Sequence, residues 1–433
     1  MLDINFIKEN VDKVRTAVIN KHGDGTIVGA ALELSEKRTD LIQRIEKLRQ
    51  ERNQISKADS EENRKRGKEI KDELKDLEPQ LDEVEKEYKE KLYLIPNIPI
   101  DGVPVGNDET ENEVLRKVGE PTKFSFAPKD HVDLGEALGI IDIENASKIS
   151  GTRFAYLKGD AALLEFALIM YAMGILTNET KLKEIAKAAG MEGYNTKPFI
   201  PVIPPTMIKP EPFVRMARLS PAVEEERYHL PKDDVYLVGS AEHTLGPLHM
   251  DQTIPEKDLP IRYVGFSSSY RREAGSYGKD TRGLIRVHQF DKVEMETFTV
   301  PEDGIKEQNF IVAIQEYLMK SLGLPYQVIV KCTGDMGDPN ANAIDIETWM
   351  PGQDKYRETH TSDLMTDYQA RRLGTKVQRK SGEAEYVHMN DGTAFAIGRT
   401  LVAILENYQQ EDGSIEIPEA LRPYMGKDKI EQK

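Results

Sequence analysis

Two runs of apolar residues, spaced alternately four and three positions apart, constrain the fold of this chain more than any other feature of its sequence. The first run consists of Leu41, Ile45, Leu48 and Ile55, with Arg52 in the remaining heptad position. The second consists of Ile70, Leu74, Leu77, Leu81, Val84 and Tyr88. Such spacing places the apolar side chains on one stripe of a helix, and a partner helix buries that stripe. Because the polar stretch SKADSEEN separates the runs, they predict an antiparallel coiled-coil hairpin over about residues 30–94.

This hairpin is expected to form an arm. A helix of about 30 residues is roughly 45 Å long, too long to pack wholly on one domain. Pro79 lies inside the second helix and should kink it or break its hydrogen-bond ladder. Residues 37–71 hold twelve Lys and Arg against seven Asp and Glu, whereas residues 72–90 hold nine acidic and three basic residues. A basic tip suits contact with a phosphate backbone, although a solvated coiled-coil face explains the same charges.

The composition restricts the class of protein. The 433 residues carry a formal net charge of −16, which argues against general coating of DNA but allows a local basic surface. The N-terminal MLDINFIKEN has no apolar run and is not a signal peptide. The most apolar stretch, AALLEFALIMYAMGIL, contains Glu165 and is short for a bilayer span, so a buried core helix is expected. The single cysteine, Cys332, excludes internal disulfides and multi-cysteine zinc sites. We therefore expect a cytoplasmic protein without membrane contact.

The remaining sequence predicts a second domain. The segment 95–110 contains three prolines and should be a linker, which gives an arm with linker over residues 1–110 and a domain over 111–433. Strand-like runs such as IRYVGF, LIRVHQFDKVEM and YQVIVKC occur as hairpins among helical segments. No strand is followed by a Gly-rich turn of the Rossmann or Walker type. The pattern favours an α+β fold, with an antiparallel sheet flanked by helices.

The stretch YRREAGSYGKDTRGLIRVHQFDKVE, at 270–294, concentrates positive charge in an acidic protein. We expect IRYVGFSSSYRRE and GLIRVHQFDKVEM to be two strands joined by the loop AGSYGKDTR. Alternation then places Arg271 and Glu273 on one face of the first strand. On the second strand, one face would carry Arg286, His288, Phe290, Lys292 and Glu294. The opposite face would carry Val287, Val293 and Met295. Arginine grips phosphate or carboxylate and an aromatic ring stacks on a base, so the hairpin predicts a site for such a ligand. An exposed charged face is the alternative, but it leaves Phe290 unexplained.

A second candidate element, MNDGTAFAIGRTLVAILENYQ, occupies residues 389–409. Leu401, Ile404 and Leu405 predict a helix with a buried face, which places Arg399 near its N-terminus. The helix dipole favours an anion there. Together with Arg271, Arg399 predicts a phosphate clamp built from distant segments.

These segments resemble the bacterial-type seryl-tRNA synthetases, a family of class II aminoacyl-tRNA synthetases, and the resemblance extends over essentially the whole chain. The stretch at 270–294 is similar to the second class II motif, and AIGRTLVAILENYQ is similar to the third. The region of Pro204 and Pro205 resembles the dimer-forming first motif more weakly. VGSAEHT matches the Thr-Ala-Glu serine loop of the family, with Ser240 in the first place, and DYQARR is another family run.

The resemblance implies the fold and the activity. The fold would be a tRNA-binding helical arm followed by a class II catalytic domain, with a sheet of six to seven antiparallel strands flanked by helices. The enzyme would be a homodimer that ligates L-serine to tRNA(Ser) through a seryl-adenylate, using ATP and Mg²⁺. A selenocysteine tRNA, tRNA(Sec), is a second candidate substrate.

The resemblance also implies the site residues. The residues expected to bind ATP are Arg271, Arg272, Glu273, Val287, Phe290, Glu358, Thr359, His360, Thr361 and Arg399. Among them, Arg271, Glu273 and Arg399 would be catalytic: Arg271 would hold the α-phosphate, Glu273 the adenine amino group and Arg399 the γ-phosphate. Phe290 would stack on adenine, while Glu358 and Thr361 would hold Mg²⁺. The residues expected to bind serine are Ser240, Ala241, Glu242, Arg271, Glu294 and Thr393.

Two departures from the family pattern leave alternatives open. Where the family reads Ser-Ser-Cys-Ser-Asn before DYQARR, this chain has HTSDL, so that Leu364 replaces the asparagine. Asp391 likewise replaces an asparagine. One alternative is a synthetase-like protein that activates another amino acid or loads a carrier protein. Another is a coiled-coil scaffold that binds nucleic acid and has an inactive catalytic domain. The presence of the arm argues against a protein that loads a carrier protein, and activation of another amino acid stays open. Arg271, Glu273, Glu358 and Arg399 argue against the inactive scaffold. A zinc-dependent serine site is excluded because the chain has one cysteine.

Overall fold

The computed structural model describes residues 1–433 except 58–59, 222, 275–281 and 433. It divides the chain into two compact units. The first unit comprises Met1–Pro99 and the short segment Gly337–Pro339, and the second comprises Ile100–Met336 and Asn340–Lys433.

The first unit is helical and contains the predicted hairpin. Helices α1 (Ile4–Glu9) and α2 (Val11–Asn20) precede α3 (Thr26–Ile55) and α4 (Glu61–Leu94), which are 30 and 34 residues long. Ser60 caps α4, since its side chain accepts a hydrogen bond from the Asn63 amide. Helices α3 and α4 pack along one buried seam, formed by Leu41, Ile45, Leu48, Ile70, Leu74, Leu77 and Val84. The heptads therefore predicted this helix pair correctly.

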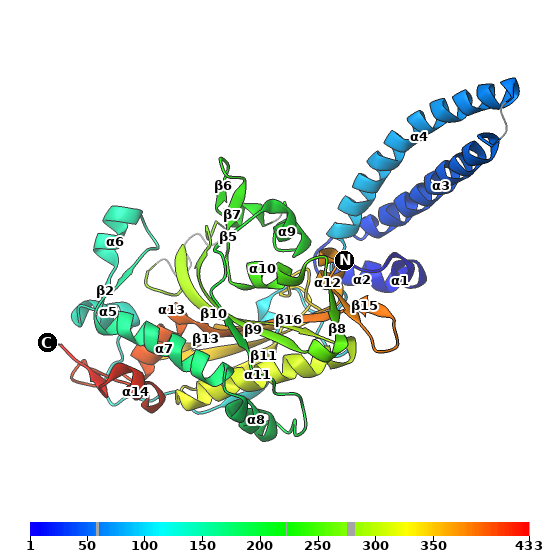
Figure 1. The fold of residues 1–433 in the computed structure, drawn as a ribbon. Helices are drawn as coiled ribbons and strands as arrows, with labels where there is room; N and C mark the ends of the chain where they lie inside the picture. The colour runs from blue at the N-terminus through cyan, green and yellow to red at the C-terminus, as the bar shows by residue number, and fades with distance from the viewer. Residues whose placement is uncertain (58–59, 222, 275–281, 433) are drawn as a thin grey trace. The chain divides into compact units, whose positions relative to one another are not determined.

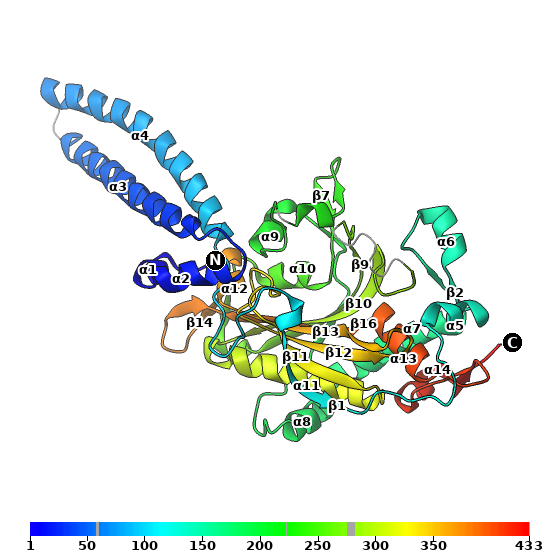
Figure 2. The same cartoon turned by 180° about the vertical axis from the view of Figure 1, so that it is seen from behind.

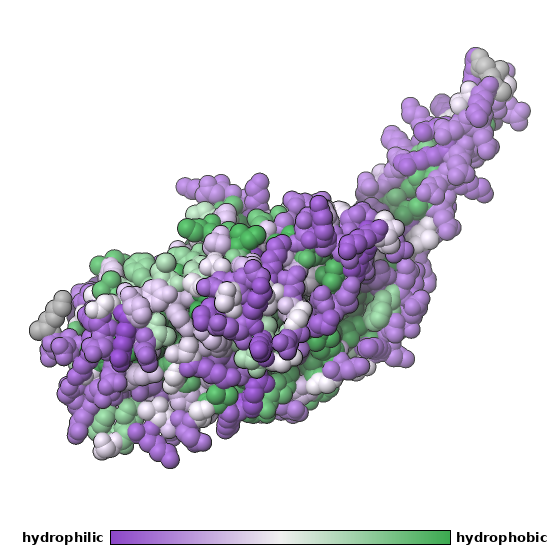
Figure 3. Space-filling view, turned by 60° about the horizontal axis from the view of Figure 1, so that its bottom comes forward, coloured by the Kyte–Doolittle hydropathy of each residue, from purple (hydrophilic) through white to green (hydrophobic). Residues whose placement is uncertain are grey.

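Two further features of the arm formed by α3 and α4 are the continuity of α4 at Pro79 and the ion pairs on its surface. Pro79 lies within a single helix, α4, so the helix is not broken there, although a proline donates no backbone hydrogen bond. Arg66 bonds to Glu51 at 2.7 Å across the two helices and also contacts Glu69 and Glu73. On the face shown in Figure 3, most of the surface of the arm is hydrophilic, with a small apolar patch partway along it. Part of the basic charge near the tip is thus neutralised within the arm itself.

The second unit is built on an eight-stranded sheet with the order β1-β11-β12-β13-β16-β10-β9-β4 (Figures 1 and 2). The strands, in that order, are Glu113–Val118, Tyr326–Val330, Asn342–Met350, Lys355–Thr366, His388–Ala396, Gln289–Thr299, Ile261–Tyr270 and Ile200–Val202. The seven strands from β1 to β9 pair antiparallel, as expected, and β4 adds an eighth strand parallel to β9.

The sheet has one apolar face and one polar face. Helices α7 (Asp160–Leu176), α11 (Gly304–Ser321) and α13 (Ile397–Asn407) share a core with strand residues that include Val293, Met295, Ile344 and Ile346. The alternate strand residues, including Glu294 and Asp345, project to the other face. The other helices of this unit are shorter. They are α5 (His131–Ala137), α6 (Ile143–Ser150), α8 (Glu179–Ala188), α9 (Pro210–Arg215), α10 (Glu242–Leu245), α12 (Tyr368–Leu373) and α14 (Arg422–Met425).

Four small sheets complete the described part of this unit. Their strands are β2 (Ile141–Asp142) with β3 (Tyr156–Leu157), β5 (Met207–Ile208) with β7 (Val235–Leu237) and β6 (His229–Leu230), β8 (Thr253–Pro255) with β14 (Lys376–Gln378) and β15 (Ala384–Tyr386), and β17 (Ile415–Glu416) with β18 (Lys429–Ile430).

The apolar stretch predicted as a core helix forms α7, but only one side of this helix is buried. Leu163, Phe166 and Met170 lie on its other side and are 51–62% exposed. In the described part of the chain, no single helix combines the length and apolarity that crossing a bilayer requires.

The second predicted strand begins later than expected. Strand β10 starts at Gln289 rather than Gly283, because the backbone N–H groups before it have other partners. The Leu284 amide donates to His131 Nε2 and the His288 amide donates to the Arg153 carbonyl. The predicted alternation therefore holds only from residue 289 onward. Most of the expected loop, residues 275–281, lies outside the described residues.

Candidate active site

A cavity of about 220 Å³ opens on the polar face of the sheet. It collects side chains from β10, β13, β16, α13 and the segments beside β9. Its lining residues are Arg218, Glu242, Arg271, Glu273, Leu284, Ile285, Arg286, Val287, Phe290, Lys292, Glu358, Thr359, Thr361, Asp363, Asp391, Thr393, Ala396, Gly398 and Arg399.

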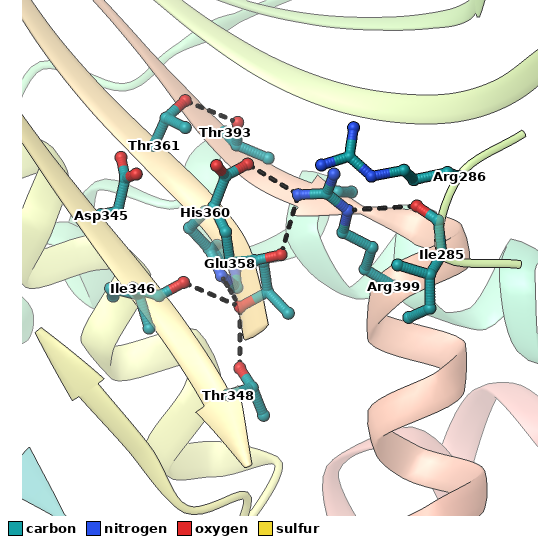
Figure 4. Close-up of polar contacts among 12 residues, drawn as sticks. Ile285, Arg286, Asp345, Ile346, Thr348, Glu358, His360, Thr361, Thr393 and Arg399 are labelled. Carbon is teal, nitrogen blue, oxygen red and sulfur yellow. Dashed lines mark hydrogen bonds and ion pairs between the residues drawn. The ribbon is translucent and has the colours of Figure 1, made fainter. Parts of the chain in front are cut away.

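Arg399 and Glu358 form a charged pair at one side of this cavity (Figure 4). Arg399, in the first turn of α13, donates from Nη1 to Glu358 Oε1 at 2.7 Å and to the Glu358 carbonyl at 2.9 Å. Its Nε contacts the Ile285 carbonyl at 3.5 Å. Burial opposes ionisation of Glu358, but Arg399, Lys331 and Arg271 lower its pKa to about 2. The pair is therefore ionised at neutral pH and holds the guanidinium at the cavity wall.

Arg271 and Glu273 follow β9 and lie beside the second strand, β10. The Arg271 guanidinium lies over the Phe290 ring, 5.3 Å from its centroid, and its Nε donates to the Gly239 carbonyl at 3.1 Å. Glu273 adopts a φ of +52°, which is uncommon for a residue other than glycine, and accepts a hydrogen bond from Arg286 at 3.2 Å. Two arginines, an aromatic ring and a carboxylate thus converge as a site for phosphate and a base would require.

Another group of charged side chains lies deeper in the cavity. Lys292 Nζ is 2.6 Å from Glu294 Oε2 and donates to Ser240 Oγ at 3.0 Å. Burial raises the pKa of Glu294 to about 7, although Lys292 acts in the opposite direction. Glu242 begins α10 and is buried, and its Oε2 has no hydrogen-bond partner among the described residues. An acceptor of this kind at a cavity wall is suited to a ligand that brings a donor.

Two hydroxyl groups face each other near Glu294. Thr361 and Thr393, on neighbouring strands, have their Oγ1 atoms 3.2 Å apart (Figure 4). Gln315 of α11 donates to the carbonyls of both residues and so fixes the two strands in register. A β-bulge opposite Val293 and Glu294 lets Phe395 face the helices while Thr393 faces the cavity.

A divalent cation would find few protein ligands here. Among the described residues no cluster of three or more His, Cys, Asp or Glu side chains is arranged to hold a metal. Glu358 and Thr361 line the cavity, and Asp345 pairs with Thr361 across the strands, with its buried Oδ1 unpartnered in the described part of the chain. One or two carboxylates suit Mg²⁺, which takes its other ligands from phosphates and water.

The structure does not bring every predicted residue to the cavity. Arg272 lies over Tyr228 instead, and its amide donates to the Glu226 carbonyl. His360 lies on the apolar side of the sheet against Phe395, because a β-bulge at Thr359 of β13, opposite Ile346 and Glu347 of β12, shifts the register of the strand. Its pKa is lowered by burial to about 3, so it is a neutral core residue.

The remaining serine-loop residues lie beside the cavity. Ala241 and Ser240 are fully buried, and Ser240 Oγ reaches Glu294 at 3.5 Å. Leu364, the first departure from the family pattern, is also fully buried and is not among the lining residues. Asp391, the second departure, does line the cavity and accepts a hydrogen bond from Arg218 at 2.7 Å.

The sequence interpretation assigned no role to several charged residues of this site, among them Arg218, Arg286, Lys292, Asp345 and Asp363. Alternation along β10 placed Lys292 on the binding face and was the available signal for it; the same alternation was assumed for Arg286, which precedes the strand. Nothing local marked Arg218 or Asp345, since their partners come from other strands.

Comparisons with known proteins agree with this geometry. Residues 1–99 match the family model described as the seryl-tRNA synthetase N-terminal domain. Residues 225–408 match the class II tRNA synthetase core domain (G, H, P, S and T). The chain is 42% identical to the serine–tRNA ligase of Thermodesulfovibrio yellowstonii, over 99% of this chain and 100% of that protein.

Two solved structures are similar over the full length. The seryl-tRNA synthetase from Pyrococcus horikoshii complexed with ATP superposes with a TM-score of 0.89 at 35% identity, covering 100% of both chains. The cytoplasmic serine–tRNA ligase from Naegleria fowleri in complex with AMP gives a TM-score of 0.85 at 30% identity, covering 100% of this chain and 99% of that one.

Proposed function

The chain belongs to the seryl-tRNA synthetase family of class II aminoacyl-tRNA synthetases, and we propose that its cavity activates L-serine with ATP and transfers it to tRNA(Ser). The observation that carries this proposal is the joint placement of Glu242 with Arg271 and Arg399. A buried carboxylate acceptor suits an amino-acid ammonium group, and the two guanidinium groups on the same cavity suit a triphosphate.

The proposed chemistry requires positioning and charge stabilisation, without an enzyme nucleophile. An oxygen of the serine carboxylate attacks the α-phosphorus of ATP, the bond from that phosphorus to the bridging oxygen breaks, and pyrophosphate leaves. A terminal ribose hydroxyl of the tRNA then attacks the carbonyl carbon of the adenylate, loses its proton, and AMP leaves. Arg271 would orient the α-phosphate with the serine carboxylate, and Arg399 the γ-phosphate.

The ATP partners are assigned by chemistry and position. Phe290 would stack on the adenine ring, Glu273 would accept from its amino group, and Val287 would contact the nucleotide through its backbone. Glu358 and Thr361 would hold Mg²⁺, which supplies neutralisation of phosphate charge when bound. In this arrangement the Arg399–Glu358 pair keeps both groups at the phosphate side of the cavity before ATP arrives.

The selection of serine is assigned to the buried side chains of Glu242, Glu294 and Thr393. Glu242 would bind the ammonium, while Glu294 and Thr393 would contact the hydroxyl. A pocket that pairs a substrate hydroxyl rejects alanine strongly, because alanine leaves those groups unpaired. ATP–pyrophosphate exchange across the amino acids tests this assignment: serine should stimulate exchange best. Better stimulation by alanine, threonine or cysteine would point to the alternative, activation of another amino acid, with Asp391 as the first residue to examine.

The exposed side of α7 supports a homodimer. Leu163, Phe166 and Met170 form an apolar stripe at spacing i, i+3, i+7, as a helix buried in an interface would. Two-fold dimers are also the commonest soluble oligomers. Sedimentation at micromolar concentration should give the mass of two chains, and the mass of one chain would contradict the proposal.

The arm is assigned to tRNA binding in a cytoplasmic enzyme. Helical RNA is recognised mainly through its backbone and shape, so a basic tip suits it. Replacing residues 36–92 by a short flexible linker should preserve serine-dependent exchange and abolish aminoacylation of tRNA(Ser). Loss of exchange in a variant that remains folded would refute this division of labour. The same assay with tRNA(Sec) tests whether that tRNA is also charged.

A further inference from the structure

Three carboxylates lie side by side on the cavity face of the sheet, two residues along from Thr361, Thr393 and Glu294. Asp363 of β13 pairs directly with Asp391 of β16, and Asp391 pairs directly with Glu296 of β10. Directly paired residues of antiparallel strands point to the same face, with Cβ atoms about 5 Å apart. We call Asp363, Asp391 and Glu296 the carboxylate row. Like charges placed directly opposite one another are destabilising, so this row needs compensation.

Arg218 supplies a positive charge to the row. Its Nη2 lies 2.7 Å from Asp391 Oδ2 and 3.8 Å from Asp363 Oδ2. The turn that carries Arg218 is held in place, since Gln369 donates to the Met216 carbonyl at 2.9 Å. The Arg218 amide also donates to the Phe213 carbonyl at 3.2 Å. Arg218 is thus a fixed cation and not a mobile surface side chain.

Glu296 differs from Asp391 in its surroundings. Both of its carboxylate oxygens are buried and have no hydrogen-bond partner among the residues that the structure describes. Burial, with the nearby Asp391 carboxylate, raises the pKa of Glu296 well above its usual value. Burial also raises the pKa of Asp391, and the Arg218 guanidinium acts in the opposite direction on both residues. Because Asp391 accepts a hydrogen bond from Arg218 and Glu296 has no hydrogen-bond partner among the described residues, Arg218 and Asp391 form the ion pair of the row.

The pair forms part of the wall on which the amino acid would be bound. Arg218, Asp391 and Asp363 line the same cavity as Glu242, whose Oε2 is available for an ammonium group. Without a guanidinium over the row, the carboxylates of Asp391 and Asp363 would compete with Glu242 for that ammonium group. A substrate with a second ammonium group would also be attracted.

We propose that Arg218 is a specificity-determining residue, which offsets negative charge in the carboxylate row and so directs the substrate ammonium group to Glu242. The inference rests on the proposed assignment of Glu242 as the ammonium acceptor. It predicts that the enzyme discriminates against diamino acids through Arg218, although Arg218 itself need not contact serine. It also accounts for the aspartate at position 391, since a neutral asparagine there would leave Arg218 with a weaker partner.

The test is ATP–pyrophosphate exchange in the full-length protein, with L-2,4-diaminobutyrate as the competing diamino acid. Arg218→Gln should lower kcat/KM for serine by about tenfold or more, as for a buried charge left unpaired. It should also strengthen inhibition by diaminobutyrate about tenfold, with the KM for ATP within about twofold of the wild-type value. The double variant Arg218→Gln/Asp391→Asn should recover both properties to within about threefold, because it removes the two opposite charges together.

The controls separate charge from structure. Arg116→Gln makes the same substitution at a remote pair with Glu316 and should change neither property. Arg218→Lys keeps the charge and should retain discrimination, which provides a reading if Arg218→Gln does not fold. Unchanged serine kinetics and diaminobutyrate inhibition in folded Arg218→Gln, or a double variant no better than the single one, would overturn the inference.

Glu242→Gln should raise the serine KM at least tenfold. If it does not, the proposed ammonium site is wrong. If it does while Arg218→Gln is silent, only the role of Arg218 is wrong.

Discussion

Replacing His131 with alanine should weaken ATP binding, although His131 is not among the residues that line the cavity. His131, the first residue of α5, accepts a hydrogen bond at Nε2 from the Leu284 amide at 3.1 Å. Its Nδ1 lies 2.8 Å from Glu406 Oε1, and the other Glu406 oxygen accepts from the Gly352 amide at 2.9 Å. Leu284 lines the cavity, and the carbonyl of the next residue, Ile285, contacts Arg399. The imidazole therefore anchors the backbone that shapes the phosphate side of the site.

The hydrogen bonds set the size of the effect. The variant would leave the buried Leu284 N–H unpaired, at a cost of about 1–3 kcal/mol, and would remove a bond to a carboxylate worth about 1.5–3 kcal/mol. The cost of the unpaired Leu284 N–H acts directly on the cavity wall. This free-energy cost corresponds to roughly a fivefold to hundredfold change in an equilibrium constant. We expect the KM for ATP in pyrophosphate exchange to rise about tenfold or more, with a smaller change in the KM for serine.

Two conservative variants identify which bond matters. His131→Gln can place an acceptor near the position of Nε2 and should restore much of the ATP affinity. His131→Asn can retain only the donor toward Glu406 and should behave like the alanine variant. An unchanged KM for ATP in folded His131→Ala, or a glutamine variant as defective as alanine, would refute the anchoring role.

Other outcomes test separate parts of the second unit. Because burial raises the pKa of Glu294 to about 7, kcat/KM for serine should fall as the pH drops below about 7, and Glu294→Gln should flatten this profile. Glu307→Gln should lower the free energy of unfolding by about 3–5 kcal/mol in denaturant titrations, because it leaves the fully buried Arg262 without its charged partner; a loss below about 1 kcal/mol would contradict this. Gly283→Ala should raise the KM for ATP, since its φ is +91° and a Cβ there would lie 2.1 Å from His131 Nε2; wild-type kinetics would show that the backbone adapts.

Local periodicity was sufficient to predict the elements whose partners lie nearby in the sequence. The heptads identified α3 and α4 because each apolar stripe needs only the other helix. The predicted alternation of side chains between the two faces of the sheet was correct along β10, from Gln289 onward. It failed for residues 283–288 because Leu284 and His288 donate to His131 and Arg153, which lie more than 100 positions earlier in the chain. Hydrogen bonds of that range leave no periodic signal.

The same limit applies to the site. Motif resemblance indicated Arg271, Glu273, Phe290 and Arg399, and the structure brings all four to one cavity although they come from separate segments. It also indicated His360, but a single bulge in β13 turns that side chain to the opposite face. Bulges depend on pairing between strands and cannot be recognised from one strand alone.

The sequence also could not predict the role of residues whose partners lie far away in the chain. Arg218 has no distinguishing neighbours in the sequence, and its charge acquires a role only beside Asp391, which is 173 positions further along the chain. Its contribution could be recognised only once β13, β16 and β10 were known to lie side by side.

The position of β16 in the sheet has a consequence for the synthesis of this protein. Residues 388–396 follow both β10 and β13 in the sequence, yet β16 lies between these two strands and pairs with both. Until the ribosome has released this segment, β13 and β10 each expose a row of unpaired backbone groups, and such edges promote aggregation. The contacts of α3 with α4, in contrast, join neighbouring parts of the first 99 residues. The helical arm can therefore fold before the second unit has been translated, whereas the central sheet can close only after residues 388–396 have emerged from the ribosome.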